Sequence, residues 1–411
     1  MAASEIITGL DIGTTKISAI IAELEDGSLP KIIGVGTVPS EGLRKGIVVN
    51  MEKTVVSIEN ALDMAEKMSG VRINEVYVGI AGDHIRSYNG KGVVAIAGDN
   101  NEINEDDIRR AIDAAKAVVI PIDREIIHVI PLEFTIDEQK GIKDPMGMSG
   151  MRLETEVHIV TGAITSAQNI YRCVERAGVR VRDLVLEPLA SSYSVLSDAE
   201  KDLVVVVVDI GGGTTDIAMF YEGTIRNTSV VALGGHSVTS DLARCLRTSP
   251  EEAEKIKIAH GSAFRLDVED KDRVIEIPSV DGSSRKKAAK ELIIDIVEPR
   301  MEEMLRLALN EIRKSEFAGM MTSGVVLTGG ASMLHGAIRL AEEIFDMPVK
   351  SGIPHGFTGL IDLVKSPIYA TGIGLILYAD RHRFELEAML DEDQGPNPFE
   401  KIWERMKRWF S

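Results

Sequence analysis

Two stretches of the chain share one pattern of apolar and polar positions. In the first, the mostly apolar segment 6–12 leads through a Gly/Thr turn into a second apolar segment at 17–22. In the second, the apolar run 203–208 leads through a turn of three glycines and two threonines into an apolar segment at 217–221. Short apolar runs joined by a Gly-rich turn are typical of β-hairpins. Two copies of the pattern predict a duplicated domain with related halves.

Each copy continues in the same order, with a further strand and then a helix. In the first half these are expected at 31–35 and 51–68, and in the second half at 230–233 and 238–246. The chain has 411 residues, which is too long for one core, and its apolar content of 44 % can fill two. The pattern therefore predicts an α/β protein with two lobes built on the same plan.

Segments that interrupt the duplicated pattern predict added subdomains. Residues 84–162 break into the first half with a polar helix start at Asn104 and an extended segment at 126–136. Residues 247–299 carry a charged helix at 250–259 and short strands in the second half. We expect the lobe cores to take up the remainder, with 1–83 and 163–200 in the first lobe and 201–246 and 300–380 in the second.

The composition changes again near the end of the chain. Residues 385–397 hold five acidic residues and run into Gly395-Pro-Asn-Pro398, a composition typical of a flexible linker. Residues 398–411 follow a helical pattern in which the bulky apolar positions fall within an arc of about 120° at 100° per residue. These positions are Phe399, Ile402, Trp403, Met406, Trp409 and Phe410.

Such a terminal helix would be about 20 Å long, which is too short to cross a bilayer. Its basic residues lie outside the apolar arc, as in helices that lie in a membrane interface. The alternative is a terminal helix docked on its own domain, but the acidic linker favours a detached tail that binds membrane lipids. The formal charge of the whole chain, −18, argues against nucleic acid as a partner.

The two Gly/Thr turns carry residues suited to holding a nucleotide. Backbone N–H groups at Gly-rich turns can cradle phosphate oxygens, and threonine hydroxyls can add donors. Asp11 and Asp209 precede the turns and can hold hydrated Mg²⁺, and Lys16 can offset phosphate charge. The turn residues are Gly13, Thr14 and Thr15 in the first copy, and Gly211, Gly212, Gly213, Thr214 and Thr215 in the second. One such turn could be a plain hairpin, but two matched turns favour a nucleotide site.

Two further Gly-rich turns could complete the site. The segment 324–333 predicts a strand that runs into a turn at Gly329, Gly330 and Ala331, with a helix from about Ser332. Gly234 and Gly235 form a similar turn before the helix at 238. Helix N-termini favour anions, and glycines allow a ligand to approach closely. Each turn taken alone is also compatible with an ordinary strand-to-helix connection.

In the order of these motifs the chain resembles the superfamily of actin, Hsp70 and the sugar kinases. The segments 187–192 and 370–374 match connecting segments of that superfamily. The resemblance implies ATP and Mg²⁺ between the lobes, with Asp11 and Asp209 serving the metal through water. By position it also implies that Glu187 places the attacking water, and that Glu251 and Lys255 contact ribose or adenine. Because the carboxylates of Asp11 and Glu187, which the resemblance links to hydrolysis, are both present, slow hydrolysis is chemically possible.

Within the superfamily the chain is most similar to the FtsA family of cell-division proteins. The similarity lies in five segments: 128–137, 141–154, 157–161, 189–196 and 277–282. It implies that the inserted subdomain serves filament contacts between copies of the chain. It also implies that the second-half small subdomain binds the C-terminal peptide of FtsZ, with Arg300 at a family position linked to that contact. A solvated arginine at a helix start is the alternative for Arg300.

Taken together, the resemblance and the tail predict an actin-like ATP-binding protein of cell division. It would polymerise, tether FtsZ filaments to the cytoplasmic face of the inner membrane at the septum as a peripheral protein, and help recruit later divisome membrane proteins. Two alternatives remain from other classes: an actin-like ATPase of pilus assembly, and a small-molecule kinase. A kinase needs a carboxylate base aimed at a substrate hydroxyl, and the sequence offers none beyond Asp11.

Overall fold

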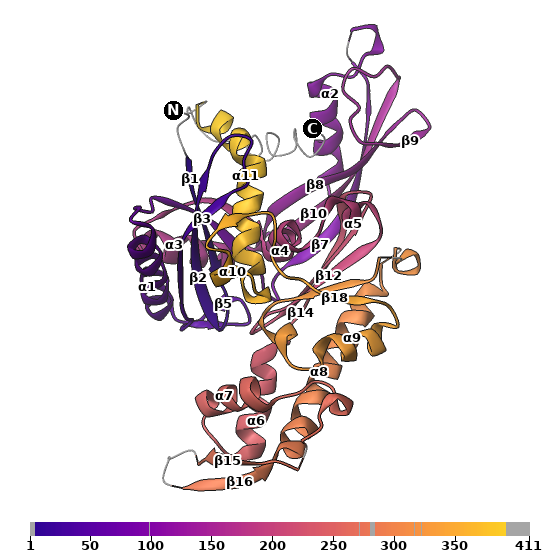
Figure 1. Cartoon of the computed structure of the whole chain (residues 1–411). Coiled ribbons are helices and arrows are strands. Elements are labelled where there is room, and N and C mark those ends of the chain that lie inside the picture. The colour runs from indigo at the N-terminus through magenta and orange to yellow at the C-terminus, as the bar shows by residue number, and fades with distance from the viewer. Residues whose placement is uncertain are drawn as a thin grey trace.

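The computed structural model describes residues 5–97, 99–270, 272–279, 284–315, 317–321 and 323–391, the last nine of them as backbone only. Two lobes lie side by side, with one subdomain projecting above them and another below (Figure 1). Within the described residues no helix is both long and apolar enough to span a membrane. The amphipathic segment 398–411 lies outside the described residues, so its expected helix stays a prediction.

The first lobe is built on a sheet with the strand order β11-β6-β1-β2-β3-β19. The strands are β1 (Glu5–Ile12), β2 (Lys16–Leu24), β3 (Lys31–Pro39), β6 (Glu75–Ile80), β11 (Arg180–Leu186) and β19 (Thr358–Gly359). The helices packed around it are α1 (Met51–Ser69), α3 (Ile164–Arg176), α4 (Glu187–Val195) and α11 (Ala370–Asp391). Short connections add β4 (Leu43–Arg44), β5 (Ile47–Val48), α5 (Asp198–Asp202) and α10 (Ile361–Val364).

The second lobe repeats this plan, which confirms the predicted duplication. Its sheet, β18-β17-β12-β13-β14, has the same order as β11-β6-β1-β2-β3. Even the register agrees, because Asp11 pairs with Ser18 across β1 and β2 as Asp209 pairs with Asp216 across β12 and β13. The strands are β12 (Val205–Ile210), β13 (Thr215–Tyr221), β14 (Thr224–Val231), β17 (Val325–Thr328) and β18 (Val349–Ser351). The helices are α6 (Gly235–Leu246), α8 (Lys290–Ile312) and α9 (Ala337–Phe345).

The third strand of this lobe lies earlier than the apolar pattern predicted. Glu222 and Gly223, with φ angles of 55° and 82°, form a tight turn that starts β14 at Thr224 rather than at 230. Two consecutive residues with positive φ are the requirement of the hairpin turns that suit twisted strands. Because the first half of β14 is mostly polar, the pattern of apolar positions did not predict it.

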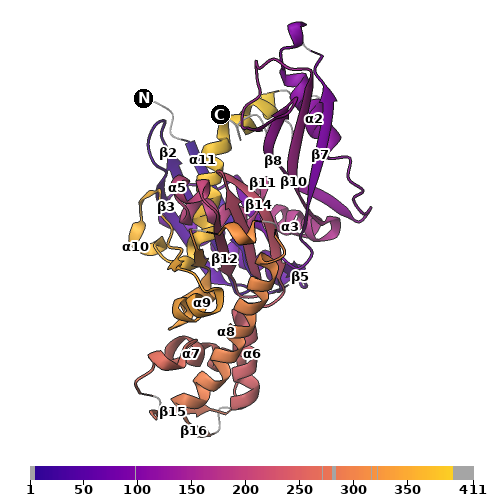
Figure 2. The ribbon, with the colours of Figure 1, turned by 90° about the vertical axis from the view of Figure 1, so that its right-hand side faces the viewer.

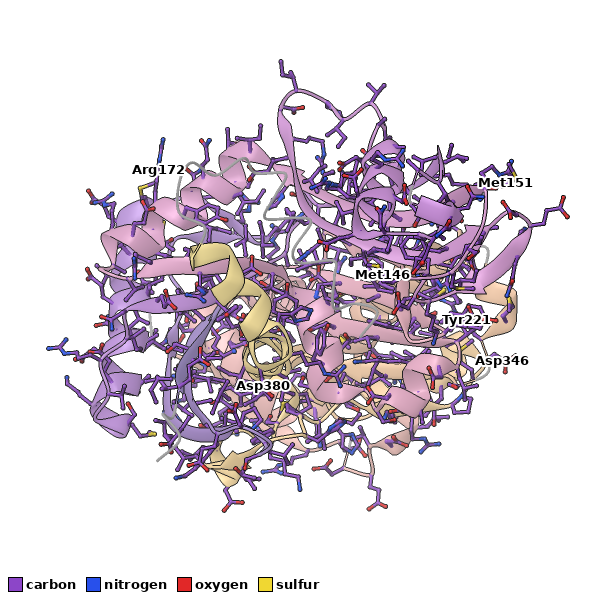
Figure 3. The ribbon with its side chains drawn as sticks, turned by 90° about the horizontal axis from the view of Figure 1, so that it is seen from above. Met146, Met151, Arg172, Tyr221, Asp346 and Asp380 are labelled. Atoms are coloured by element: carbon purple, nitrogen blue, oxygen red, sulfur yellow. The ribbon has the colours of Figure 1, made fainter. Side chains whose placement is uncertain are left out.

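The inserted subdomain has its own sheet and its own core. It consists of β7 (Arg86–Ala95), α2 (Glu105–Ala115), β8 (Arg124–Ile136), β9 (Gln139–Ile142) and β10 (Arg152–Ala163), with strand order β7-β10-β8-β9. Asn104 caps α2 as expected, accepting a hydrogen bond from Asp107 N at 3.0 Å. Figure 2 shows the subdomain projecting from the lobes, and Figure 3 labels Met146 and Met151 on it.

The inserted subdomain also touches the second lobe directly. The buried ring of His158, on β10, lies within 2.8 Å of Asn89 Oδ1 and within 3.0 Å of Thr228 Oγ1 of β14. Burial lowers the pKa of His158 to about 4, so the ring is neutral at physiological pH. Its role in the structure is therefore to join the inserted subdomain to the second lobe.

The lower subdomain contains α7 (Pro250–His260), β15 (Val274–Pro278) and β16 (Arg285–Ala289), with α6 and α8 connecting it to the lobe above. Two expected boundaries differ from the structure. The boundary at 299/300 falls inside α8, which continues through Pro299. The expected linker start at 385 falls inside α11, which continues to Asp391 because 385–391 contains good helix formers and neither glycine nor proline.

Candidate nucleotide-binding site

A cavity of about 1010 Å³ is lined by residues of both lobes. Its walls combine the ends of β1 and β12 with the N-terminal ends of α4, α6 and α11. Most of the predicted residues lie on its lining: Asp11, Gly13, Thr14, Thr15, Lys16, Glu187, Asp209, Gly211, Gly212, Gly235, Gly329, Gly330 and Ala331. The fold therefore brings together motifs that are far apart in the sequence.

The two Gly/Thr turns have the same geometry and touch each other. Gly13 N donates to Lys16 O at 3.0 Å, and Gly211 N donates to Thr214 O at 3.0 Å. A Cβ atom added to Gly212 would lie 2.5 Å from Thr15 Cγ2, so a side chain there would push the turns apart. Glycine is required at this contact, and it leaves the backbone open to a ligand on the cavity side.

Lys16 lies at the end of the first Gly/Thr turn, beside the carboxylate of Asp11. Its Nζ is 2.7 Å from Asp11 Oδ2 and 3.0 Å from Ser18 Oγ. A lysine placed in this way can offset the charge of a bound phosphate while it keeps Asp11 in a fixed orientation. The equivalent position in the second copy is Thr214, so only the first turn provides a positive charge at this position.

Four carboxylates lie close together at the site: Asp11, Glu187 and Asp209 on the cavity lining, and Asp216 near Glu187. Burial raises the pKa of Asp209 to about 6 against the effect of a 2.8 Å hydrogen bond from Ser191 Oγ. Burial also raises the pKa of Asp216 to about 7, although Thr214 Oγ1 donates to its Oδ2 at 2.7 Å. Burial and the nearby Asp11, Asp216 and Asp209 raise the pKa of Glu187 well above its usual range. Such a cluster attracts a cation.

Asp216 is the functional candidate that the sequence reasoning missed. It is 3 % exposed, and its Oδ1 has no hydrogen-bond partner among the described residues. A buried carboxylate oxygen without a partner is uncommon and points to a missing ion or water. The duplicated pattern could have indicated it, because Asp216 stands opposite Asp209 as Ser18 stands opposite Asp11.

The raised pKa values predict that the ligand-free protein loses stability as the pH rises. A carboxyl group with a folded pKa above its unfolded value stabilises the fold fully below the unfolded pKa, and the contribution is lost as the pH passes the folded pKa. For Asp209 and Asp216 this window runs from about pH 4 to about pH 7. We expect thermal unfolding of the parent protein to show a steeper loss across this window than that of Asp216→Asn. Identical profiles would contradict the assignment.

Six predicted site residues lie outside the cavity lining. Gly213 packs against Thr14 and Lys45, and Gly234 packs against the second turn. Thr214 and Thr215 direct their hydroxyls to Asp216 and to Leu233 O, so they stabilise the hairpin. Glu251 and Lys255, expected to contact the nucleoside, are exposed, and Lys255 Nζ is 2.6 Å from Glu252.

The residues of α7 that line the cavity begin at Glu254. Glu254 and Lys257 line the cavity, and Lys257 Nζ reaches Glu254 at 2.7 Å and Thr239 Oγ1 at 3.0 Å. The sequence places α7 near the site but does not give the rotation of the helix about its axis. The turn after β17 also differs from the prediction, since Gly330–Met333 is a 3₁₀ turn and α9 begins only at Ala337.

The residues present fit a nucleotide with a divalent cation. Backbone N–H groups of two Gly/Thr turns and Lys16 suit phosphate oxygens, and Asp11 and Asp209 suit a hydrated Mg²⁺. The size of the cavity leaves room for a nucleoside beside Gly235, Lys257 and Gly330. In the part of the chain that the structure describes, no group of three or more His, Cys, Asp or Glu side chains is arranged to hold a metal ion.

Two family models match the chain. Residues 206–374 match the model of cell division protein FtsA, and residues 82–161 match the SHS2 domain inserted in FtsA. Among relatives, cell division protein FtsA of Pseudomonas aeruginosa is 46 % identical over 98 % of this chain and 97 % of its own. Cell division protein FtsA of Escherichia coli K12 is 38 % identical over 94 % of this chain and 93 % of its own.

Solved structures share the fold at low sequence identity. The PilM–PilN type IV pilus biogenesis complex matches with a TM-score of 0.66 at 16 % identity, over 90 % of this chain and 98 % of that chain. MreB5 of Spiroplasma citri bound to ADP matches with a TM-score of 0.57 at 14 % identity, over 93 % of this chain and 98 % of that chain. These similarities confirm the actin-like fold and add nothing on function.

Proposed function

Because the chain belongs to the FtsA family of cell-division proteins, we propose that it binds ATP and Mg²⁺ between its lobes and tethers FtsZ filaments to the cytoplasmic membrane. The observation that carries the nucleotide part is the pair of matched turns, each preceded by a carboxylate, on one cavity. The pilus-assembly alternative shares the fold at 16 % identity, whereas FtsA relatives share 38–46 %. The kinase alternative still has no substrate base other than Asp11.

In this proposal the residues of the chain position the ligand rather than react with it. The two turns and Lys16 hold the phosphates, and Asp11 and Asp209 hold the metal through water. Magnesium neutralises phosphate charge and orients the phosphates. Glu187 would orient an attacking water, and burial together with the neighbouring Asp11, Asp216 and Asp209 raises its pKa well above its usual range in the ligand-free protein. We expect turnover to be slow at most, as the resemblance implies.

The membrane part of the proposal rests on the tail. As a helix, segment 398–411 would place its bulky apolar residues, including both tryptophans of the chain, on one face, and its net charge is only +2. Apolar burial then provides most of the affinity, and one helix binds reversibly. If copies of the chain assemble into actin-like filaments, many tails face the membrane together and binding strengthens sharply. Assembly under the control of ATP would thereby control attachment.

The FtsZ part of the proposal concerns the lower subdomain. Arg300 lies in the middle of α8, not at a helix start, and its side chain is 28 % exposed. Its Nε is 2.6 Å from Asp241 Oδ2, and its guanidinium also pairs with Glu303. These partners fix the orientation of the guanidinium and leave part of it accessible to an acidic group of the FtsZ peptide.

Replacing Arg300 by glutamate should weaken binding of the FtsZ C-terminal peptide by at least about tenfold. The change places a third carboxylate beside Asp241 and Glu303, and a lost charge-assisted hydrogen bond is worth about 1.5–3 kcal/mol. Fluorescence anisotropy with a labelled peptide measures the affinity. Arg306→Glu on the same helix is the control, because Arg306 pairs only with Glu302 at 2.7 Å in the described residues and is 62 % exposed. Equal affinities for both variants and the parent would place the peptide elsewhere.

A further inference from the structure

Two buried hydroxyl groups support the carboxylate of Asp209. Ser191 Oγ donates a hydrogen bond to Asp209 Oδ2 at 2.8 Å, and it also lies 3.1 Å from Thr371 Oγ1. All three side chains are buried. A serine hydroxyl has one hydrogen, and Ser191 gives it to Asp209, so Thr371 is the donor in its contact with Ser191. The three side chains thus form a chain of hydrogen bonds that ends on one carboxylate oxygen.

The hydroxyls and the carboxylate belong to different lobes. Ser191 lies on α4 and Thr371 lies in the first turn of α11, both in the first lobe, whereas Asp209 lies near the end of β12 in the second lobe. The two helices cross closely, since a Cβ atom on Gly374 would be 1.9 Å from Ala190 O (Figure 1). This crossing brings the two hydroxyls together beside the strand of the opposite lobe.

The carboxylate of the first copy is supported in another way. Asp11 Oδ2 lies 2.7 Å from Lys16 Nζ and 3.5 Å from Ser18 Oγ, and both groups belong to its own hairpin. In the second copy the position equivalent to Ser18 is Asp216, a second carboxylate that repels Asp209. The hydroxyl that Asp11 finds on its own hairpin therefore reaches Asp209 from the opposite lobe.

This support suits a carboxylate that holds a metal through water. An ionised carboxylate can accept about four hydrogen bonds, so the bond from Ser191 leaves most of that capacity for water. A hydrogen bond to the charged form favours that form, and it also fixes the plane of the carboxylate. Without the hydroxyl, Asp209 Oδ2 would lose a donor in a place that is closed to bulk water.

We propose that Ser191, supported by Thr371, is a positioning residue that holds Asp209 in the orientation needed for the hydrated Mg²⁺ of the bound nucleotide. The inference rests on the proposed function, because it requires a nucleotide with Mg²⁺ in the cavity. It adds that the two lobes share the metal site. The second lobe supplies the carboxylate, and the first lobe supplies the hydroxyl that orients it. Metal affinity therefore depends on the contact between α4 and β12.

The test compares how much Mg²⁺ strengthens nucleotide binding in the full-length parent and in Ser191→Ala. Isothermal titration with the non-hydrolysable analogue AMPPNP, once with Mg²⁺ and once with EDTA, gives two dissociation constants, and their ratio is the gain from the metal. We expect Ser191→Ala to reduce this gain by about tenfold, the lower end of the usual effect of groups that orient metal ligands. Binding in EDTA should stay unchanged.

A second pair of variants tests the same chain of hydrogen bonds. Thr371→Val keeps the branched shape and removes the hydroxyl, so it should reduce the gain from Mg²⁺ by less than Ser191→Ala does. Thr371→Ser keeps the hydroxyl and should bind like the parent. This pair carries the test if Ser191→Ala does not fold.

Ser192→Ala is the matched control. Ser192 is the next residue of α4 and is also fully buried, but its hydroxyl donates to Leu189 O at 2.7 Å within its own helix. The control should therefore bind AMPPNP like the parent with Mg²⁺ and with EDTA.

The possible outcomes separate this inference from the proposed function. The inference alone is overturned if the parent gains affinity from Mg²⁺ and Ser191→Ala keeps the full gain. It is also overturned if Ser191→Ala weakens binding equally with Mg²⁺ and with EDTA, or if Ser192→Ala loses the same gain. A parent that binds no nucleotide, or binds it equally well with and without Mg²⁺, overturns the proposed nucleotide site and this inference together.

Discussion

Asp11→Ala is expected to lower the affinity for Mg²⁺·ATP by about 10–100-fold, the usual effect of removing a group that orients a metal through its bound water. Asp11 is 6 % exposed at the end of β1 and lies on the cavity lining opposite Asp209. Its removal also leaves Lys16 without the carboxylate at 2.7 Å, so Lys16 no longer has a fixed orientation toward the phosphates. Isothermal titration of ATP in the presence and absence of Mg²⁺ measures both effects.

The control for this variant is its stability without ligand. Asp11 contributes to the raised pKa of Glu187 and of Asp209, so its removal relieves repulsion among buried carboxylates. The variant should therefore unfold at the same or a higher temperature than the parent, while it binds Mg²⁺·ATP less well. Opposite changes of stability and affinity are the signature of a strained binding site. Unchanged affinity with Mg²⁺ would remove Asp11 from the site.

Gly374→Val should destabilise the fold by about 3 kcal/mol or more, which exceeds the usual cost of overpacking because the clash involves backbone on both sides. Gly374 lies where α11 crosses α4, and a Cβ atom there would be 1.9 Å from Ala190 O and 2.4 Å from Ala190 C. A shift of either helix would also change the cavity, since Glu187 and Thr371 at the N-terminal ends of these helices line it. Chemical denaturation measures the loss, and weaker ATP binding should accompany it.

Gly319→Ala is the matched control for this crossing. A Cβ atom added at Gly319 meets nothing within 4 Å, and its backbone conformation is open to other residues. We expect that change to leave the denaturation midpoint within experimental error of the parent. A similar loss in both variants would mean that glycine content, rather than the α4–α11 contact, accounts for the effect.

The duplication of the two lobes was the feature of the fold that could be predicted most fully from the sequence. The two apolar–turn–apolar segments predicted hairpins, and the structure shows them with equivalent hydrogen bonds at Gly13 and Gly211. Periodicity fails where polar residues form a strand, as in β14, because cross-strand hydrogen bonds rather than apolar contacts define it. The expected boundary at 299/300 also differs from the structure, because α8 continues through Pro299.

The predicted turn residues mostly line the cavity, whereas the predicted residues of α7 do not. Turn chemistry is local, so Gly211, Gly212 and Lys16 could be assigned from neighbouring letters alone. The part of α7 that faces the cavity depends on the packing of one helix against another, and this packing places Lys257 and Glu254 on the lining rather than Lys255 and Glu251. Asp216 is set apart by its Oδ1 atom, which has no hydrogen-bond partner among the described residues, and only three-dimensional neighbours show that a partner is missing.

The central claim, that this chain holds FtsZ filaments on a membrane, is tested most directly by sedimentation with lipid vesicles. Purified FtsZ, Mg²⁺·ATP and vesicles are mixed either with the full chain or with a form that ends at Gln394, and the pellets are compared. The account predicts that FtsZ pellets with the full chain and stays in solution with the shorter form. FtsZ that pellets equally with both forms, or with neither, would contradict the proposed tether.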